Sequence, residues 1–334
     1  MEITAAPHAH SNKTSLVVGG VSYLLLLVAF WVLVRHFALS QRLGHMPSTF
    51  TAFSLILAPY WFFGFGLAET IRRILPTRLP RVFASSLLAL PYLIYALPRG
   101  EFRWVFLFVF LFVPAASNAS FEYGSLRRPL PAGLCWQDVL VLAAVGVPVE
   151  FHLVEAAFPH PGLTSLSKLL LVDSALYSFL VVRLLEGVGY DFRPKLGDFV
   201  IGVRELLSFA PIVIGLGLAL HFITPHGGLP SPASAFSAVV ITLFFVAIPE
   251  ELFFRGLLQN LLEPRIGRSG GLWVSAVIFG LSHFNKPLPF NWRYVLLATI
   301  AGVFYGRAWR SRRRLLASAT THACVDVLWS LWFR

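Results

Sequence analysis

The chain has 334 residues, of which 57% are hydrophobic and only 13% are charged, and its mean hydropathy is +0.72. Because an average soluble domain carries about 25% charged residues, this composition excludes a water-soluble globular protein and favours one that lies in lipid. The net charge of +11 is typical of basic cytoplasmic loops, so no nucleic acid partner is expected. Two cysteines, Cys135 and Cys324, are too few for a disulfide framework or a cysteine-based metal site.

Long uncharged stretches alternate with polar segments along the whole chain, and a helix needs about 20 apolar residues to cross a bilayer. The pattern predicts an all-α, polytopic transmembrane helical bundle with about 11 spans, and a count of 8–11 fits it. In chain order the predicted spans are 15–37, 49–70, 82–98, 103–117, 134–150, 165–184, 205–223, 233–258, 270–284, 291–308 and 315–333. The fourth, fifth and ninth are short enough to be re-entrant or tilted.

The basic residues of the loops indicate an orientation. If the N-terminus lies inside, more than twice as many Lys and Arg residues fall in inside segments as in outside ones. This bias predicts a cytoplasmic N-terminus and an outside C-terminus, and we expect the plasma (inner) membrane. The most polar long connection is 187–204, so we divide the chain into an N-terminal transmembrane region, residues 1–190, of unassigned role, and a C-terminal region, residues 195–334.

Ionisable residues within predicted spans are the first candidates for function, because charge inside a bilayer is costly. Near the end of span 233–258, Glu250 and Glu251 follow Pro249. Glu251 and Arg255 are four residues apart, so they share a helix face and can pair. Glu250 points about 100° away from Glu251 around the helix, towards different surroundings. The two adjacent carboxylates therefore have separate environments.

Two histidines follow on later spans. Phe279 and His283 are four residues apart at the end of span 270–284, and His322 and Asp326 share one face of the last span. In the N-terminal region, Asp173 lies in the middle of span 165–184 and needs a partner that the sequence does not identify. The ionisable residues are thus concentrated in the C-terminal third.

Four of these residues, Glu250, His283, His322 and Asp326, form a set suited to hydrolysis. A carboxylate can activate water as a general base, while imidazoles can orient that water, protonate a leaving amine or stabilise an oxyanion. Alternatively, two histidines and a carboxylate match the ligands of a catalytic zinc. A divalent metal such as zinc, held by a subset of these four residues and Glu251, therefore stays open as a cofactor.

The same residues resemble the CPBP family of intramembrane proteases, also called CAAX proteases and bacteriocin-processing enzymes or the Abi family, which includes type II CAAX prenyl endopeptidases. The family motifs EExxxR, FxxxH and HxxxN or HxxxD match, in order, Glu250, Glu251 and Arg255, then Phe279 and His283, and then His322 and Asp326. Gly302 and Gly306 match its small-residue motif on the intervening helix. The resemblance covers residues 195–334 and not the N-terminal region.

The resemblance implies an intramembrane endopeptidase that hydrolyses peptide bonds of membrane-associated substrates, among them prenylated CAAX-type peptides. Glu250 would activate water with His283 and His322, and Glu251 with Arg255 would support them. The family is described both as glutamate-type and as metallo-type. Relatives with Asn in place of Asp326 can donate a hydrogen bond to an oxyanion, whereas an ionised Asp only accepts. Asp326 would instead orient His322, ligate a metal or stay protonated.

Two other functions remain open for such a sequence. A non-proteolytic membrane scaffold or immunity protein of the same fold would tolerate loss of Glu250. A proton-coupled transporter would show interrupted helices in corresponding halves, whereas the charged residues here concentrate in one half. The expected partners are membrane lipid and a membrane-associated peptide or protein substrate, and the sequence does not indicate an oligomeric state.

Overall fold

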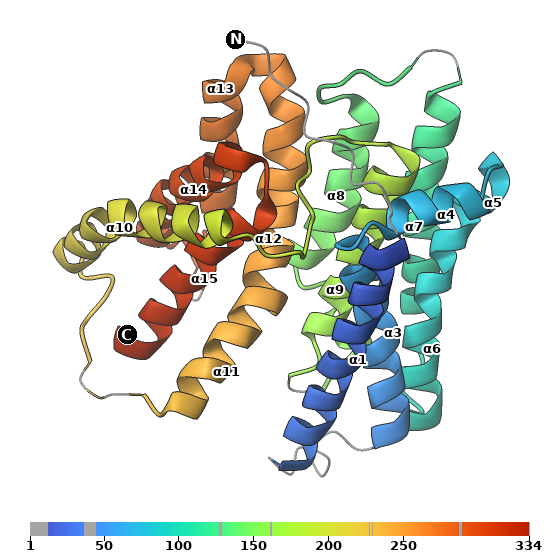
Figure 1. The fold of residues 1–334 in the computed structure, drawn as a ribbon, viewed down its shortest axis with the longest axis horizontal. Coiled ribbons are helices and arrows are strands. Elements are labelled where there is room, and N and C mark those ends of the chain that lie inside the picture. Colours follow the sequence, from blue (N-terminus) through green and yellow to red (C-terminus); the bar gives the residue numbers. More distant parts are fainter. Residues whose placement is uncertain are drawn as a thin grey trace. The chain divides into compact units, whose positions relative to one another are not determined.

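The structure is a computed structural model that describes residues 13–36, 45–126, 129–160, 162–226, 228, 230–286 and 289–333. Within these ranges the regular elements are helices, and β-structure is limited to one isolated bridge between Pro225 and Phe333. The prediction of an all-α fold is confirmed. The chain divides into two compact units, residues 1–131 with 135–186 and residues 132–134 with 187–334 (Figure 1). We call them unit 1 and unit 2.

Unit 1 is built from long apolar helices and shorter helical turns. Its α-helices are α1 (Lys13–His36), α3 (Met46–Phe63), α4 (Leu67–Ile74), α5 (Arg78–Ala84), α6 (Leu90–Ala96), α7 (Trp104–Gly124), α8 (Trp136–Glu150) and α9 (Ser165–Leu176). Shorter 3₁₀ or π segments are η1 (Ser85–Ala89), η2 (Leu97–Arg99), η3 (Glu155–Ala157) and η4 (Tyr177–Val182). Helix α9 is buried nearly all round, so it forms the core of this unit.

Asp173 lies within this buried helix. Its side chain is fully buried, and neither carboxylate oxygen has a hydrogen-bond partner among the described residues. The described part of unit 1 therefore does not supply the hydrogen-bond partner that the buried carboxyl group of Asp173 needs.

Unit 2 contains the residues singled out by the sequence. Its elements are α10 (Leu196–Ala219), α11 (Pro232–Thr242), η5 (Leu243–Ala247), α12 (Ile248–Glu251), η6 (Leu252–Gln259), α13 (Asn260–Leu281), α14 (Trp292–Arg312) and α15 (Leu315–Trp332). The elements from α11 to α13 form one helical run that breaks at Gly267, whose φ of 77° and ψ of 164° are not helical. Ser275 Oγ donates to the carbonyl of Phe254 at 2.6 Å, so the two arms of the run pack side by side.

The number of spans differs from the prediction. Among the described residues, six helical runs are long and apolar enough to cross a membrane, or up to seven if the bent pair α3–α4 counts as one span, so a count of about 11 is not confirmed. The predicted span 49–70 is bent by 98° between α3 and α4. Predicted spans 233–258 and 270–284 belong to one run, and the 15 residues of α8 are too few for a straight span. Helices α14 and α15 carry too many polar residues to meet the same requirement.

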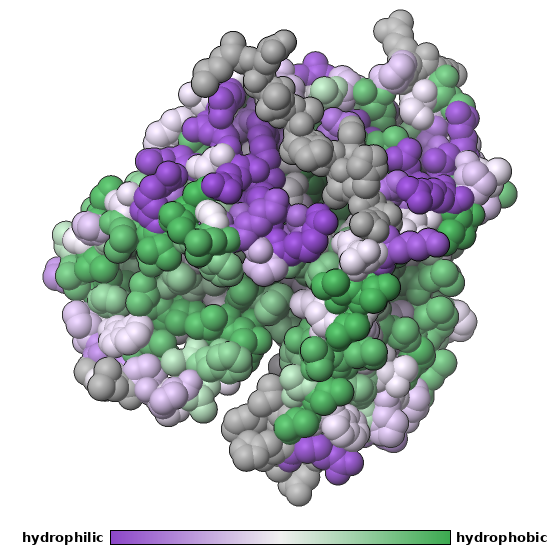
Figure 2. Space-filling view, viewed as in Figure 1, coloured by the Kyte–Doolittle hydropathy of each residue, from purple (hydrophilic) through white to green (hydrophobic). Residues whose placement is uncertain are grey.

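The surface of unit 2 is apolar over its helices. Large exposed hydrophobic residues line α10, α11 and the second arm of α13. Figure 2 shows this apolar surface and, at the end of unit 2 near α13, a gathering of hydrophilic residues. Such a surface is stable in hydrocarbon rather than in water, which together with the apolar helical runs identifies an integral membrane protein.

The start of α15 is fixed by a charged network that sets the position of this helix. Arg314 Nε donates to both oxygens of Asp198 at 2.8 and 2.9 Å, and its Nη1 donates to Asp191 Oδ2 at 2.7 Å. The Nη2 atom donates to the carbonyl of Arg193 at 2.7 Å. Gly189 packs here with a φ of 77°, and any side chain would collide with the backbone of Arg313. The connection that precedes α10 thus anchors α15.

Helix α14 approaches α13 and η6 closely because two glycines face them. A Cβ atom on Gly302 would lie 3.0 Å from Ala276 Cα and 3.2 Å from Arg255 Nη2. A Cβ atom on Gly306 would collide with Leu272 and Gln259. The two small residues therefore provide the close helix contact on which the site described below depends.

The Asp191 contacts predict a pH dependence of stability. Burial alone would raise the pKa of Asp191, but hydrogen bonds from Arg193 and Arg314 outweigh it, so this pKa lies below its ordinary value. The contribution to stability is present above the ordinary Asp pKa of about 4 and is lost as pH falls through the lowered pKa. We expect Asp191→Asn to lower the free energy of unfolding by about 1–3 kcal/mol at neutral pH. Thermal unfolding in detergent should show this gap closing in acid, and a gap that stays constant down to about pH 2 would contradict the assignment.

Candidate functional site

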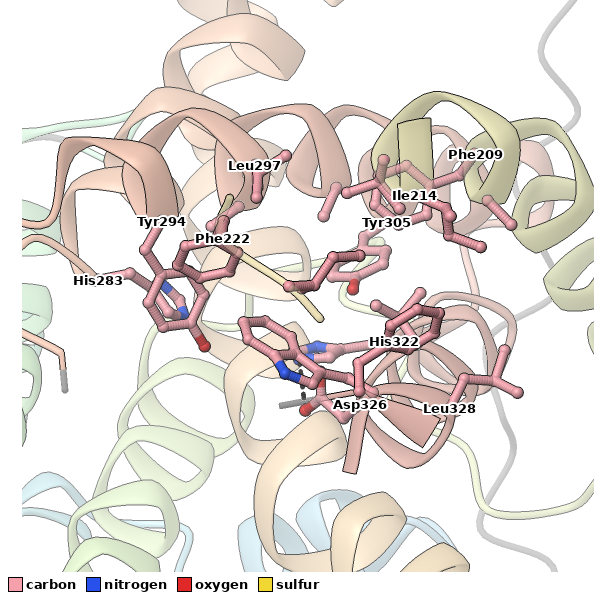
Figure 3. Close-up of a pocket in the computed structure, with 18 of the residues that line it drawn as sticks. Phe209, Ile214, Phe222, His283, Tyr294, Leu297, Tyr305, His322, Asp326 and Leu328 are labelled. Atoms are coloured by element: carbon pink, nitrogen blue, oxygen red, sulfur yellow. Dashed lines mark ion pairs between the residues drawn. The ribbon is translucent and has the colours of Figure 1, made fainter. Parts of the chain in front are cut away.

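The residues singled out by the sequence surround one cavity in unit 2. The cavity has a volume of about 230 Å³ and lies among α10, α14, α15 and the residues around α12 (Figure 3). Its polar wall contains Glu250, His283, Lys286, Tyr294, Tyr305, His322 and Asp326. Apolar side chains from α10, α14 and α15 form the remaining wall. The site is thus a polar pocket with a largely apolar lining.

The two adjacent glutamates have separate surroundings, as the helix geometry predicts. They lie in the single turn α12, which is flanked by the π-helical segments η5 and η6, and π-helical turns are frequent at functional sites. Glu250 lines the cavity with a side chain that is 34% exposed, whereas Glu251 is fully buried. Glu250 can therefore meet water and substrate, while Glu251 contacts protein groups.

Glu251 connects the helices that form the site. Its Oε1 accepts from Arg255 Nη1 at 3.0 Å and from His322 Nδ1 at 2.8 Å. Its Oε2 accepts from the hydroxyl of Ser318, whose oxygen also lies 2.9 Å from the carbonyl oxygen of Tyr305. The buried carboxylate of α12 thus joins η6 and α15, and it requires a proton on Nδ1 of His322.

Arg255 is a fully buried cation with several partners. Besides Glu251, its Nη2 donates to the carbonyl of Gly302 at 3.1 Å. Its guanidinium also lies over the ring of Phe279 at 4.5 Å and over that of Tyr305 at 5.3 Å. Aromatic faces attract a desolvated cation, so Phe279, the first residue of the FxxxH pattern in this sequence, stabilises Arg255. Phe279 therefore has two contacts: it lines the cavity, and its ring also stabilises the Glu251–Arg255 ion pair.

His322 presents its second nitrogen to the cavity. Its Nε2 lies 3.4 Å from Asp326 Oδ2 and 3.9 Å from Glu250 Oε2. The imidazole stacks on the ring of Tyr305, with centroids 4.5 Å apart and an interplanar angle of 15°. Figure 3 shows His322 and Asp326 side by side at the cavity. Because carboxylate oxygens only accept, Nε2 carries a proton as well as Nδ1, and the ring is held in place by Glu251 behind it and by Tyr305 against its face.

His283 reaches the same cavity from the end of α13. Its Nδ1 lies 2.9 Å from the carbonyl of Phe279, which can only accept, so Nδ1 carries the proton. Its ring packs against Tyr294 with centroids 4.5 Å apart. With the proton on Nδ1, the neutral form of this imidazole has its lone pair on Nε2, where it can accept a hydrogen bond from water.

The geometry does not form a metal site among the described residues. No group of three or more His, Cys, Asp or Glu side chains there is arranged to hold a metal ion. The Nδ1 atoms of His283 and His322 are already bonded to a carbonyl and a carboxylate, so each ring offers only Nε2. The donors of the expected zinc set line one cavity but, as placed, are not arranged around a single ion.

All seven residues predicted for the site therefore lie at the cavity or directly behind it. The sequence pattern missed Ser318, Tyr294 and Tyr305. Ser318 lies four residues before His322, so it shares a helix face with a candidate residue, which is a signal that could have identified it. The tyrosines carry no such signal, because aromatic residues are frequent throughout this chain.

The buried pair predicts a large effect of Glu251→Gln on stability. The substitution leaves Arg255 buried without its carboxylate, which costs about 3–5 kcal/mol in such pairs. Glu205→Gln is a matched control, because Glu205 is also buried but its arginine partners, Arg204 and Arg307, are about half exposed and stay hydrated. Thermal unfolding in detergent should show a much larger loss for Glu251→Gln. Equal losses for the two variants would contradict a special role for the Glu251–Arg255 pair.

Comparison with protein families gives one match. Residues 232–328 match the family described as type II CAAX prenyl endopeptidase Rce1-like. This match confirms the resemblance to CPBP-family proteases and contains the three motifs that line or support the cavity. No curated protein and no solved structure matches the chain.

Proposed function

We propose that this protein, whose residues 232–328 match the type II CAAX prenyl endopeptidase Rce1-like family, is an intramembrane endopeptidase in which Glu250 activates the attacking water. The observation that carries the proposal is the cavity itself. Glu250, His283, His322 and Asp326 converge on it from α12, α13 and α15 within a membrane-embedded unit. Ionisable groups that share a cavity in a membrane protein are candidates for catalysis.

The first step is attack by water. Glu250 accepts a proton from the water while the water oxygen bonds to the carbonyl carbon of the scissile peptide bond. His283 accepts a second hydrogen bond from that water through Nε2, which orients it. His322 Nε2 lies 3.9 Å from Glu250 Oε2, so this imidazole faces the carboxylate that acts as the base.

The second step is collapse of the tetrahedral intermediate. The bond from carbon to nitrogen breaks, and the leaving amine takes the proton that Glu250 received from water. Asp326, 3.4 Å from His322 Nε2, accepts a hydrogen bond from this ring and holds it towards Glu250. All atoms and protons are accounted for by the substrate, one water and Glu250.

The substrate is a membrane-associated peptide or protein, and prenylated CAAX-type peptides are one class of it. The matched family is named for such peptides. The apolar walls from α10, α14 and α15 fit a substrate that brings apolar groups to the site. Membrane lipid is the other partner, in contact with the apolar outer surface of the helices.

We propose that no metal takes part, because the donors do not form a metal site as placed. A chelator should then leave cleavage unchanged. Loss of cleavage with a chelator, and its return on addition of zinc, would instead support a metal held by a subset of Glu250, Glu251, His283, His322 and Asp326.

We also propose that the N-terminus is cytoplasmic, the C-terminus is outside, and the protein lies in the plasma (inner) membrane. Arg307, Arg310 and Arg312 gather at the end of α14, as expected for a cytoplasmic end. With Cys135 and Cys324 replaced by Ala, single cysteines at Ser311 and Ser231 can be compared in intact cells. A thiol reagent that does not cross membranes should label Ser231→Cys and not Ser311→Cys, and the reverse pattern would overturn the orientation.

The catalytic proposal is tested by Glu250→Gln. The substitution keeps the size of the side chain but removes the base, so cleavage of a quenched prenylated peptide or of a membrane-peptide library should fall by at least about 10²-fold. Glu205→Gln is the control, because Glu205 lies outside the cavity. Both variants and the wild type are assayed as purified, folded protein in detergent.

The outcomes separate the two kinds of function. If the wild type cleaves and Glu250→Gln does not, the peptidase function stands. If Glu250→Gln cleaves as fast as the wild type, Glu250 is not the base. If the folded wild type cleaves no peptide in either substrate set, a non-proteolytic scaffold of the same fold is favoured instead.

A further inference from the structure

The chemistry proposed above requires a donor for the oxyanion, and the polar groups already assigned do not supply one. Peptide hydrolysis develops negative charge on the carbonyl oxygen, which a preorganised donor must stabilise. An ionised Asp326 only accepts hydrogen bonds, and the Nε2–H of His322 faces Asp326 and Glu250. His283 turns a lone pair to the cavity. The donor must therefore come from another residue of the wall.

Three side chains of the cavity wall carry an uncharged donor: Tyr294, Tyr305 and Trp329. Tyr305 is only 2% exposed and stacks on His322, so it is a support of the imidazole. Trp329 packs edge-on against Tyr294 and Phe222, and it therefore holds other rings. Tyr294 is the remaining uncharged donor.

Tyr294 is positioned with little freedom. It lies in the first turn of α14, where Asn291 caps the helix by accepting from the Tyr294 backbone N–H at 3.2 Å. Its ring contacts His283, Trp329 and Phe222, with centroids 4.5, 5.4 and 5.4 Å away. A ring held on three sides gives its hydroxyl a fixed location, which is what an oxyanion donor needs.

The hydroxyl of Tyr294 also has a free donor. Within the described part of the chain it makes no hydrogen bond to another residue. Figure 3 shows Tyr294 beside His283 with its hydroxyl directed into the cavity that Asp326 faces from the other side. A phenol that has no protein acceptor and lies beside the proposed water-binding imidazole can donate to a substrate oxygen.

We propose that Tyr294 is a catalytic residue whose hydroxyl donates a hydrogen bond to the oxyanion of the tetrahedral intermediate. This inference rests on the proposed endopeptidase function. As water bonds to the carbonyl carbon, the carbonyl electron pair moves to the oxygen, and the Tyr294 O–H stabilises that charge while keeping its proton. When the carbon–nitrogen bond breaks, the electron pair returns and the hydrogen bond weakens. Tyr294 thus fills the role that an ionised Asp326 cannot fill.

The test is Tyr294→Phe, which removes the hydroxyl and keeps the ring that packs against His283. We expect kcat to fall by about 10²–10³-fold, as for removal of a single oxyanion donor, with little change in KM. A phosphonate that imitates the tetrahedral intermediate should bind at least about 10²-fold more weakly, whereas affinity for an uncleaved substrate peptide should be unchanged. Tyr190→Phe is the matched control, because it loses the same hydroxyl outside the cavity.

The ratio of phosphonate affinity to substrate affinity is measured on folded protein. A lower melting temperature of the variant therefore does not change this ratio. Suppose that the wild type cleaves peptide and that Glu250→Gln abolishes this cleavage. Equal kcat values and equal affinity ratios for Tyr294→Phe and the wild type would then overturn the role of Tyr294 and leave the peptidase function standing. A wild type that neither cleaves peptides nor prefers the phosphonate to the substrate would overturn both. A selective loss in Tyr294→Phe alone supports the assignment.

Discussion

The buried carboxylate of Glu251 is the constraint on which the site depends. It accepts hydrogen bonds from Arg255, Ser318 and His322, which belong to η6 and α15, within a unit whose surroundings offer no water to replace them. In such a place an unmatched charge costs several kcal/mol, so α12, which carries Glu251, must stay together with η6 and α15 for the carboxylate to stay satisfied. The position of His322, and through it the shape of the cavity, follows from this one group.

The environment gives two neighbouring glutamates different chemistry. Glu251 is fully buried and engaged by donors, whereas Glu250 faces a cavity that can admit water and a peptide. A helix places consecutive side chains about 100° apart, so an adjacent pair can divide between a structural and a reactive role without any further device. His283 and His322 also differ in their surroundings. Nδ1 of His283 is hydrogen-bonded to a backbone carbonyl, whereas Nδ1 of His322 is hydrogen-bonded to a carboxylate.

Much of this arrangement could be predicted from the sequence, because helical spacing determines which residues share a face. The pairs Glu251–Arg255 and His322–Asp326, each four residues apart, are in contact as expected. The span count could not be predicted, because apolar stretches do not reveal the bend between α3 and α4 or the break at Gly267. Tyr294 was also missed, since its place depends on ring contacts between residues distant in the chain.

The central claim, that Glu250 activates water for direct attack on a peptide bond, is tested most directly by following oxygen in a single turnover. The folded enzyme, in excess over a membrane-associated peptide substrate, is placed in water enriched in heavy oxygen, and the new carboxyl group is analysed by mass spectrometry. If Glu250 is a general base, every new carboxyl group carries one solvent oxygen in the first turnover. A first product whose added oxygen is unlabelled would show that an enzyme carboxylate had attacked instead, and this would contradict the role of Glu250 as a general base.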